Sequence, residues 1–194
     1  MLPENIIFVA VLLNLVGQLW YIRGIIKGHA KPNLVSWFMW MLAPFIGVFF
    51  QLKAGVGLSV LPIFMAGFGS LTVIFVALFT KNAIWKINSF DLLCGAISLM
   101  ALILYILTHN LELSIIFAIL SDALAFIPTY IKSWKYPESE SVAGYSWCIP
   151  ANIIGLLVIK DWSFAIYSFG VYFVVANIVE ILILYRKKFF KTIA

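Results

Sequence analysis

Apolar runs of about twenty residues, separated by short polar breaks, follow one another along the whole sequence. A helix needs about 20 mostly apolar residues to cross a bilayer, so 194 residues leave room for roughly seven such helices. Hydrophobic residues make up 64% of the chain and charged residues 11%, whereas a soluble domain is about half apolar and a quarter charged. We therefore predict an all-α polytopic membrane protein with seven transmembrane helices. The predicted helices are 5–26, 33–52, 58–80, 90–108, 111–132, 143–159 and 163–185.

The basic residues are distributed unevenly between the two faces that seven crossings would create. One face receives Arg23, Lys27, Lys31, Lys81, Lys86, Lys132, Lys135, Arg186, Lys187, Lys188 and Lys191. The other face receives Lys53 and Lys160. Because cytoplasmic loops carry an excess of Lys and Arg, we expect the N-terminus outside and the C-terminus in the cytoplasm, in a plasma membrane or bacterial inner membrane. The net charge of +5 then reflects contact with anionic lipids, not with nucleic acid.

Two segments of the chain repeat one another. The segment 18–27 (QLWYIRGIIK) ends its predicted helix as 123–132 (ALAFIPTYIK) does, and Pro32 and Pro137 keep the same spacing. After a five-residue insertion in the second copy, the next predicted helix opens on a Ser-Trp pair and then carries a proline. These residues are Ser36, Trp37 and Pro44 in the first copy, and Ser146, Trp147 and Pro150 in the second.

The repeat matches the first helix to the fifth and the second to the sixth, so the fourth is left without a counterpart. We predict a first three-helix bundle at 1–82, a linker helix at 83–109 and a second three-helix bundle with a basic tail at 110–194. Corresponding helices lie four crossings apart, an even number, so both bundles run in the same direction across the membrane. This is the parallel-repeat plan of transporters.

The parallel 3-1-3 plan, the outside N-terminus and the Pro-x-x-x-Ser-Trp segment 32–37, echoed by the Ser-Trp pair 146–147, resemble the SWEET and PQ-loop superfamily. Pro32-Asn33 and Pro137-Glu138 stand where members of the family have Pro-Gln. The resemblance implies a transporter of a small hydrophilic solute such as a sugar, an amino acid or a vitamin precursor. It would work by alternating access, as a uniporter or linked to protons. The alternative implied by the same fold is a membrane receptor or sorting protein without transport.

Cysteine and histidine residues are too few and too scattered to form a catalytic or metal cluster. Cys94 and Cys148 lie in apolar stretches, and His29 and His109 lie in separate polar breaks. We therefore expect no enzyme activity, no metal and no cofactor. Homo-oligomer formation stays open.

Polar residues inside a bilayer are costly unless they face other helices, so they indicate the solute pathway. The predicted substrate-binding residues are Trp37, Trp40, Ser70, Trp147, Asn152 and Asn177. Other polar residues in the predicted spans are Asn14, Gln18, Ser36, Asp122, Ser146 and Glu180.

Tryptophans dominate the start of the second predicted helix. Trp37, Trp40 and Pro44 share one helix face, and Trp147 is expected opposite them, where paired indoles would stack on a solute. The alternative is that Trp37 and Trp147 are interfacial belt residues. The family resemblance favours the pocket and matches Asn177 to an asparagine of the family's site, with Ser70 or Gly67 at the equivalent position of the first half.

Asp122 lies near the middle of its predicted helix, and no Lys or Arg lies at a comparable depth in another span. A lone carboxylate there would be costly. One hypothesis is that Asp122 couples a proton to transport or binds a cationic solute. The alternative is a neutral acid that hydrogen-bonds to a neighbouring helix.

Four residues are candidates for gating or hinge motion. Glu180 lies near the cytoplasmic face, where either an ion pair with Arg186 or Lys187 or a cytoplasmic gate is expected. Pro44, Pro128 and Pro150 lack the backbone donor and weaken their helices locally, which suits rocking bundles.

Overall fold

The computed structural model describes residues 3–53, 55, 57–80, 83–108 and 110–191, and every regular element within them is helical. The helices are α1 (Ile7–Ile26), α2 (Leu34–Lys53), α3 (Leu61–Phe79), α4 (Ser89–Leu107), α5 (Leu111–Lys135), α6 (Val142–Leu157) and α7 (Phe164–Lys191). Short 3-10 turns at Glu4–Ile6, Leu58–Val60 and Pro137–Ser139 precede α1, α3 and α6. The all-α prediction is confirmed.

Within the described residues, α1, α2, α3, α4, α5 and α7 are long and apolar enough to cross a bilayer. Helix α6 is apolar but has 16 residues, or about 24 Å at 1.5 Å per residue. This is less than the roughly 30 Å of a hydrocarbon core. The structure therefore supports an integral membrane protein with six helices of transmembrane length, and a crossing by α6 stays a prediction.

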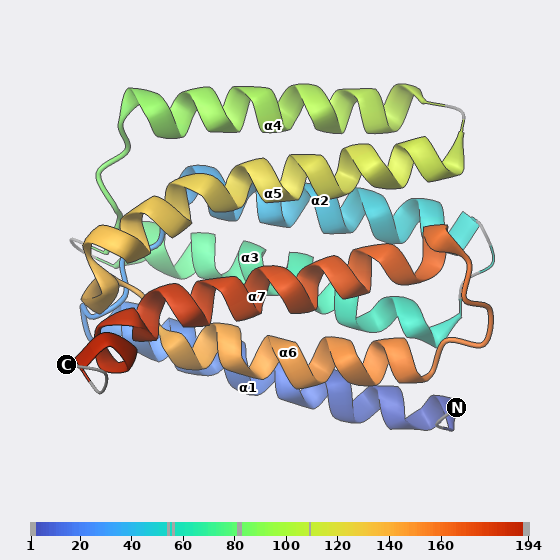
Figure 1. Ribbon diagram of the computed structural model, residues 1–194, viewed down its shortest axis with the longest axis horizontal. Helices are drawn as coiled ribbons and strands as arrows, with labels where there is room; N and C mark the ends of the chain where they lie inside the picture. The colour runs from blue at the N-terminus through green and yellow to red at the C-terminus, as the bar shows by residue number, and fades with distance from the viewer. Residues whose placement is uncertain (1–2, 54, 56, 81–82, 109, 192–194) are drawn as a thin grey trace.

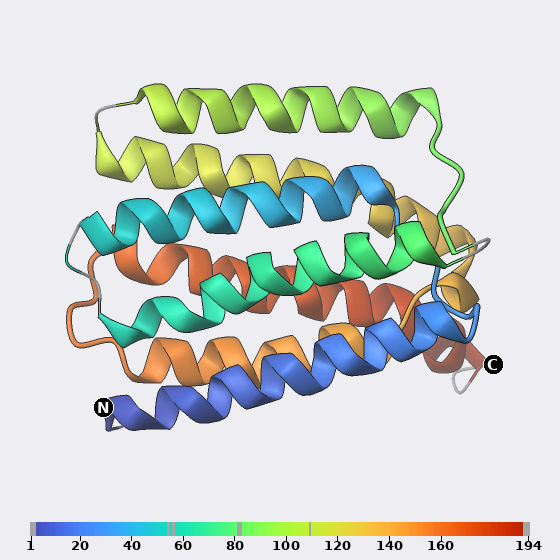
Figure 2. The same ribbon diagram turned by 180° about the vertical axis from the view of Figure 1, so that it is seen from behind.

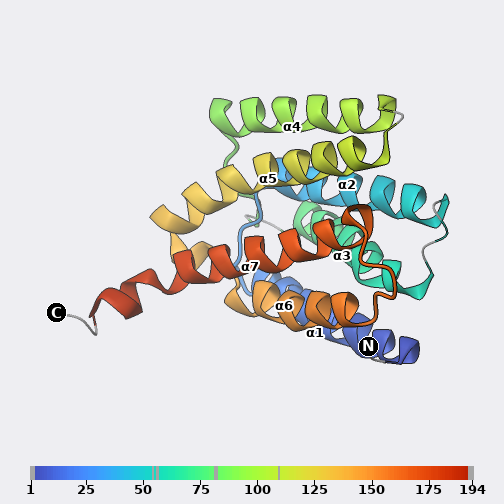
Figure 3. The same cartoon turned by 45° about the vertical axis from the view of Figure 1, so that its right-hand side comes forward.

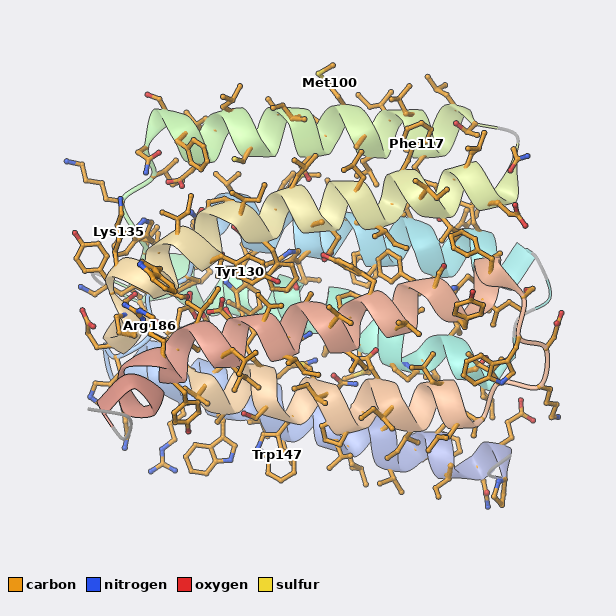
Figure 4. The ribbon with its side chains drawn as sticks, in the orientation of Figure 1. Met100, Phe117, Tyr130, Lys135, Trp147 and Arg186 are labelled. Atoms are coloured by element: carbon orange, nitrogen blue, oxygen red, sulfur yellow. The ribbon has the colours of Figure 1, made fainter. Side chains whose placement is uncertain are left out.

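The outer surface of the bundle is apolar, as a surface in contact with lipid requires. Leu12 on α1, Phe79 on α3 and Met100 on α4 are all exposed, and Met100 points away from the other helices (Figure 4). In lipid the backbone must satisfy its own hydrogen bonds, which a helix does within one segment. Apolar side chains on the outer face of such a helix therefore carry no free-energy penalty in lipid.

The helices lie side by side and alternate in direction, so the chain ends lie at opposite ends of the bundle (Figures 1 and 2). Helix α4 forms one edge, where it packs against α5 and more weakly against α2. Helices α1 and α6 form the other edge and pack against each other. The last turns of α7 extend beyond the neighbouring helices (Figure 3).

Contacts within each half of the chain follow the same pattern. Helix α3 packs against both α1 and α2, and α7 packs against both α5 and α6. The halves meet where α1 contacts α6 and α2 contacts α5. Between α5 and α7, the Tyr130 hydroxyl donates a hydrogen bond of 2.9 Å to the Ala176 carbonyl (Figure 4).

Glycines bring α1 and α6 unusually close together. A Cβ atom on Gly17 would lie 3.0 Å from the Gly144 carbonyl oxygen and 3.0 Å from the Trp147 Cβ, closer than side chains normally pack. Small residues at a crossing let two membrane helices approach. The two halves of the chain therefore meet at a backbone-to-backbone contact along this seam.

The end of the bundle that carries the C-terminus also carries most of the described basic side chains, and we call it the basic end. These side chains are Arg23, Lys27, Lys31, Lys86, Lys132, Lys135 and Arg186. At the opposite end, the Nζ atom of Lys160 lies 3.6 Å from Oε2 of Glu4. Lys81 and the side chains of Lys53, Lys187, Lys188 and Lys191 lie outside the described residues, as do His109 and the predicted domain boundaries at 82 and 109.

Candidate functional site

A pocket of about 80 Å³ lies inside the bundle, where the two halves of the chain meet. Its described lining comes from α1, α2, α3, α5, α6 and α7, and α4 contributes none of it. The polar lining residues are Asn14, Gln18, Tyr21, Ser70, Tyr145, Asn152 and Asn177. The remaining lining residues are Gly17, Trp37, Trp40, Ala66, Gly69, Val73, Phe126, Gly144, Cys148 and Phe173. None of these described residues carries a formal charge.

Four amide side chains give the pocket its hydrogen-bonding character. Asn14, Asn152 and Asn177 each donate to the carbonyl four residues earlier in their own helix, at 3.2, 2.8 and 2.8 Å. Gln18 reaches across to α3 and donates to the Met65 carbonyl at 2.7 Å. Each amide has two N–H donors and a carbonyl acceptor, so a second N–H and the oxygen have no partner within the described chain. The amide groups can therefore still bind a solute.

Aromatic rings form the wall of the pocket towards α2 and α5. The ring centroids of Trp37 and Trp40 are 5.3 Å apart, and those of Trp40 and Phe126 are 4.3 Å apart. The ring centroids of Tyr21 and Trp37 are 4.7 Å apart. The indole N–H of Trp37 is buried without a partner among the described residues. The wall thus combines flat apolar faces with one buried donor that has no partner among the described residues.

A buried ionic cluster borders the pocket on the side towards the basic end. We call Tyr21, Lys132, Glu140 and Tyr145 the tyrosine–glutamate cluster. Glu140 Oε2 accepts hydrogen bonds from the hydroxyls of Tyr21 at 2.7 Å and Tyr145 at 3.0 Å. Glu140 Oε1 pairs with the Lys132 ammonium group, which also donates to the Lys31 carbonyl at 2.6 Å. Both carboxylate oxygens are thus fully satisfied.

Sequence reasoning missed this cluster. It counted Lys132 only among the basic residues of the cytoplasmic face and assigned no role to Glu140, yet Lys132 is 3% exposed and Glu140 8%. The repeat gives one signal for Tyr21. It matches Tyr21 to Phe126 in the second copy, and both residues line the pocket. No local pattern points to Glu140, because its partners come from α1, α5 and α6.

The structure brings together most of the predicted substrate-binding residues. Trp37, Trp40, Ser70, Asn152 and Asn177 line the same pocket, although they come from four helices. Ser70 donates its hydroxyl to the Ala66 carbonyl of its own helix at 3.0 Å. Whether these residues bind a solute stays a prediction.

Trp147 does not lie opposite Trp37, and this part of the prediction is wrong. Its side chain is 37% exposed and points away from the bundle on the outer side of α6 (Figure 4). Helix α6 presents Gly144, Tyr145, Cys148 and Asn152 to the pocket, which fall on one helix face. Position 147 lies off that face, so the structure favours the interfacial interpretation for Trp147.

Of the other residues singled out in the sequence, Asn14 and Gln18 also line the pocket, whereas those that follow do not. Ser36 is buried and accepts a 3.0 Å hydrogen bond from Thr129 on α5, and Ser146 bonds to the Val142 carbonyl of its own helix. Gly67 lies against the Phe45 ring. The predicted hinge prolines, Pro44, Pro128 and Pro150, lie inside α2, α5 and α6.

Asp122 is fully buried behind the aromatic wall. Its Oδ2 accepts a 2.7 Å hydrogen bond from the Tyr172 hydroxyl on α7, and its backbone carbonyl accepts one from the Trp40 indole at 3.4 Å. Oδ1 has no partner among the described residues. This arrangement matches the alternative of an acid bonded to a neighbouring helix, and it places Asp122 in contact with a pocket residue.

Glu180 is also fully buried, but the predicted ion pair with Arg186 is wrong. Glu180 Oε1 accepts a hydrogen bond from Ser133 on α5. Arg186 instead donates to the carbonyls of Ser133 and Trp134, and its guanidinium group lies 4.6 Å from the centre of the Trp134 ring. Helix α5 runs three residues further than predicted, so its last carbonyls, which have no partner within the helix, are available to Arg186. The Lys187 side chain lies outside the described residues.

Comparisons with protein-family models, with curated proteins and with solved structures found no match to this chain. The resemblance to the SWEET and PQ-loop superfamily therefore remains an interpretation of the repeat and its motifs.

Proposed function

We propose that this chain is a small-solute membrane transporter in which two three-helix bundles, α1–α3 and α5–α7, are joined by α4 and rock around the central pocket. The matching contact patterns of the two halves support this arrangement. So does the position of the pocket, since binding sites in repeat transporters lie at the repeat interface near the middle of the membrane. The basic end faces the cytoplasm and the N-terminus lies outside.

The observation that carries the proposal is the uncharged lining with free amide groups from three helices, Asn14 and Gln18 from α1, Asn152 from α6 and Asn177 from α7. Such groups bind hydroxyl, amine or amide groups of a solute, and the indole faces of Trp37 and Trp40 favour a flat or sugar-like ring. The solute class is therefore small, hydrophilic and without net charge.

The present conformation is a contracted state of the site. A cavity of about 150 Å³ holds a molecule the size of benzene, whereas this pocket has about 80 Å³. Binding a sugar-sized solute requires the walls to separate, and rocking of the bundles at the Gly17 and Gly144 seam would provide this. Pro44, Pro128 and Pro150 supply the local weaknesses in α2, α5 and α6.

The tyrosine–glutamate cluster acts as the cytoplasmic gate, because Tyr21 and Tyr145 both line the pocket and their hydroxyls donate to Glu140. Glu180, which lies one turn beyond Asn177, belongs to the same end of the pathway. Towards the opposite end, a second small cavity of about 20 Å³ is lined in part by Gln51, Pro62 and Asn152. Since Asn152 lines both spaces, this cavity continues the pathway outward.

Asp122 would link transport to protons. It touches the pocket wall through Trp40 and is held by Tyr172 from the second bundle. A change in its protonation would alter the contact between α5 and α7. Asp122→Asn should then abolish a pH-dependent component of transport, and unchanged transport with an unchanged pH profile would refute the coupling.

A receptor or sorting protein is the alternative for the same fold. Recognition of a peptide carboxylate would need a cationic group on the pocket, and the described lining has none. We therefore favour transport.

The test is a thermal-shift screen of the purified full-length chain with neutral sugars, nucleosides and amino acids, followed by uptake into proteoliposomes. A solute that binds the folded state raises its melting temperature. We expect a shift and uptake for at least one class, both lost in an Asn152→Leu, Asn177→Leu double variant. Thr72→Val is the matched control, because Thr72 also bonds to its own helix but lies outside the pocket. Neither shift nor uptake with any class would refute the proposal.

A further inference from the structure

A third cavity, of about 260 Å³, opens at the basic end beside the last turns of α1. It lies on the other side of Glu140 from the central pocket, and its lining includes Arg23, Lys27, His29 and Ser141. Unlike that of the central pocket, its described lining includes two cationic side chains, those of Arg23 and Lys27. It therefore differs in ligand chemistry from the proposed solute site.

No described acidic side chain forms an ion pair with the basic side chains of this cavity. Arg23 and Lys27 have no acidic partner among the described residues. The one carboxylate in the lining belongs to Glu140, and its oxygens are already bound by Lys132, Tyr21 and Tyr145. An anion in the cavity would thus meet two free cations and a carboxylate whose charge is compensated.

The N-terminus of α6, beside the cavity, adds an electrostatic field that favours an anion. Helix α6 begins at Val142, and its N-cap residue, Ser141, makes no side-chain cap hydrogen bond. The first N–H groups of a helix and its dipole attract an anion. On the α1 side, the Gly24 carbonyl is covered by the N–H groups of His29 and Ala30, so that helix end presents less negative charge to the cavity.

The position of the cavity points to the membrane as the source of the anion. Trp20 lies at its edge, is 49% exposed and has the Arg23 guanidinium group 5.2 Å above its ring. Trp147 is exposed on neighbouring α6. Exposed tryptophans of membrane proteins gather at the level of the lipid headgroups. A phosphate at this depth is most readily supplied by a phospholipid.

We infer that this cavity is a binding site for a phosphate group, held by Arg23, Lys27 and the start of α6 and presented by an anionic phospholipid of the leaflet at the basic end. His29 adds a further hydrogen-bonding group. Basic pockets on the cytoplasmic side of membrane helices bind such headgroups. The inference depends on membrane insertion but not on transport.

Native mass spectrometry of the full-length chain, released from nanodiscs of phosphatidylcholine with phosphatidylglycerol, tests the inference. We expect one phosphatidylglycerol to be retained in preference to phosphatidylcholine. Arg23→Gln with Lys27→Gln should weaken this retention by about tenfold, given the attraction of basic residues near the surface for anionic lipids. The control, Lys86→Gln with Lys135→Gln, removes the same charge from exposed positions at the same end and outside the cavity, and should weaken it less than about twofold.

Two further measurements decide the source of the phosphate and guard against misfolding. Inorganic phosphate and glycerol 3-phosphate are added to the protein in neutral detergent. A melting shift with these that requires Arg23 and Lys27 supports the phosphate site but assigns it to a soluble ligand. Lys27→Gln alone, at an exposed position, should fold and show a partial loss of retention. Equal losses in the two double variants, or no preference for phosphatidylglycerol in the unaltered protein, would overturn the inference.

Discussion

The central pocket and the tyrosine–glutamate cluster adjoin one another and are both buried and polar, but they use their polar groups differently. In the cluster, Glu140 has a partner for each oxygen, and its partners come from distant parts of the chain. In the pocket, three of the four amides bond only to their own helix. Buried groups that satisfy each other hold helices together, whereas groups with free capacity are available to a ligand. This difference is the reason why we propose the cluster as a gate and the pocket as a binding site.

The largest expected effect comes from breaking the cluster. Glu140→Gln would leave the Lys132 ammonium group buried without a counter-charge. This should lower the free energy of unfolding by about 3–5 kcal/mol. Unfolding of the purified protein in detergent, followed by circular dichroism, measures it. Glu138→Gln, at an exposed position of the same segment, is the control. Equal stability of the two variants would mean that the ion pair does not hold the basic end together.

A smaller loss of stability is expected from a substitution in the aromatic wall. Trp40→Ala removes a side chain that is 6% exposed and packs on Trp37 and Phe126, and should cost about 3 kcal/mol. Trp147→Ala, on the outer face, should cost less than about 1 kcal/mol in the same unfolding assay. The reverse order would contradict the placement of the two tryptophans.

Removal of the donor to Asp122 tests the buried polar contact behind the aromatic wall of the pocket. Tyr172→Phe leaves Asp122 without its 2.7 Å hydrogen bond, and an unsatisfied buried acceptor costs about 1–3 kcal/mol. Adding Asp122→Asn to this variant should change stability by less than the sum of the two single changes, because the two residues share one interaction. A double-mutant cycle of unfolding free energies measures the coupling, and simple additivity would argue against it.

The smallest effect on stability is expected from the pocket amides. Asn177→Ala removes a hydrogen bond from the side chain to the Phe173 carbonyl of the same helix. The free energy of unfolding should therefore fall by about 0.5–1 kcal/mol. The same variant should lose the melting shift produced by the solute. A large loss of stability with an intact solute shift would reverse the roles assigned to the pocket and the cluster.

Much of the fold and part of the site could be predicted from the sequence. Apolar length predicts the helices, since each membrane helix satisfies its own backbone, and their bounds agree with the structure to within a few residues except at the extended ends of α5 and α7. Trp37, Trp40, Asn152 and Asn177 could be nominated, because polar and aromatic residues within apolar helices are rare enough to stand out.

The rotation of each helix about its own axis could not be predicted in the same way. The repeat matches Trp147 to Trp37, yet Trp147 is exposed on the outer surface of the bundle and Trp37 lines the pocket. In a chain apolar on all sides, hydrophobicity does not distinguish the inner face of a helix from the outer face. The partners of Glu140, Lys132 and Arg186 were equally hidden, because they depend on which helix ends meet.

The sequence by itself thus determined that the chain is helical, that its helices are long and apolar, and that polar side chains lie within them, since these properties follow from each segment alone. The tertiary structure alone decided which of those side chains face one another. Tyr21, Glu140 and Tyr145 meet through contacts between α1, α6 and the segment before it, and Asp122 meets Tyr172 between α5 and α7. Such pairings depend on packing between segments far apart in the chain, and no local pattern records them.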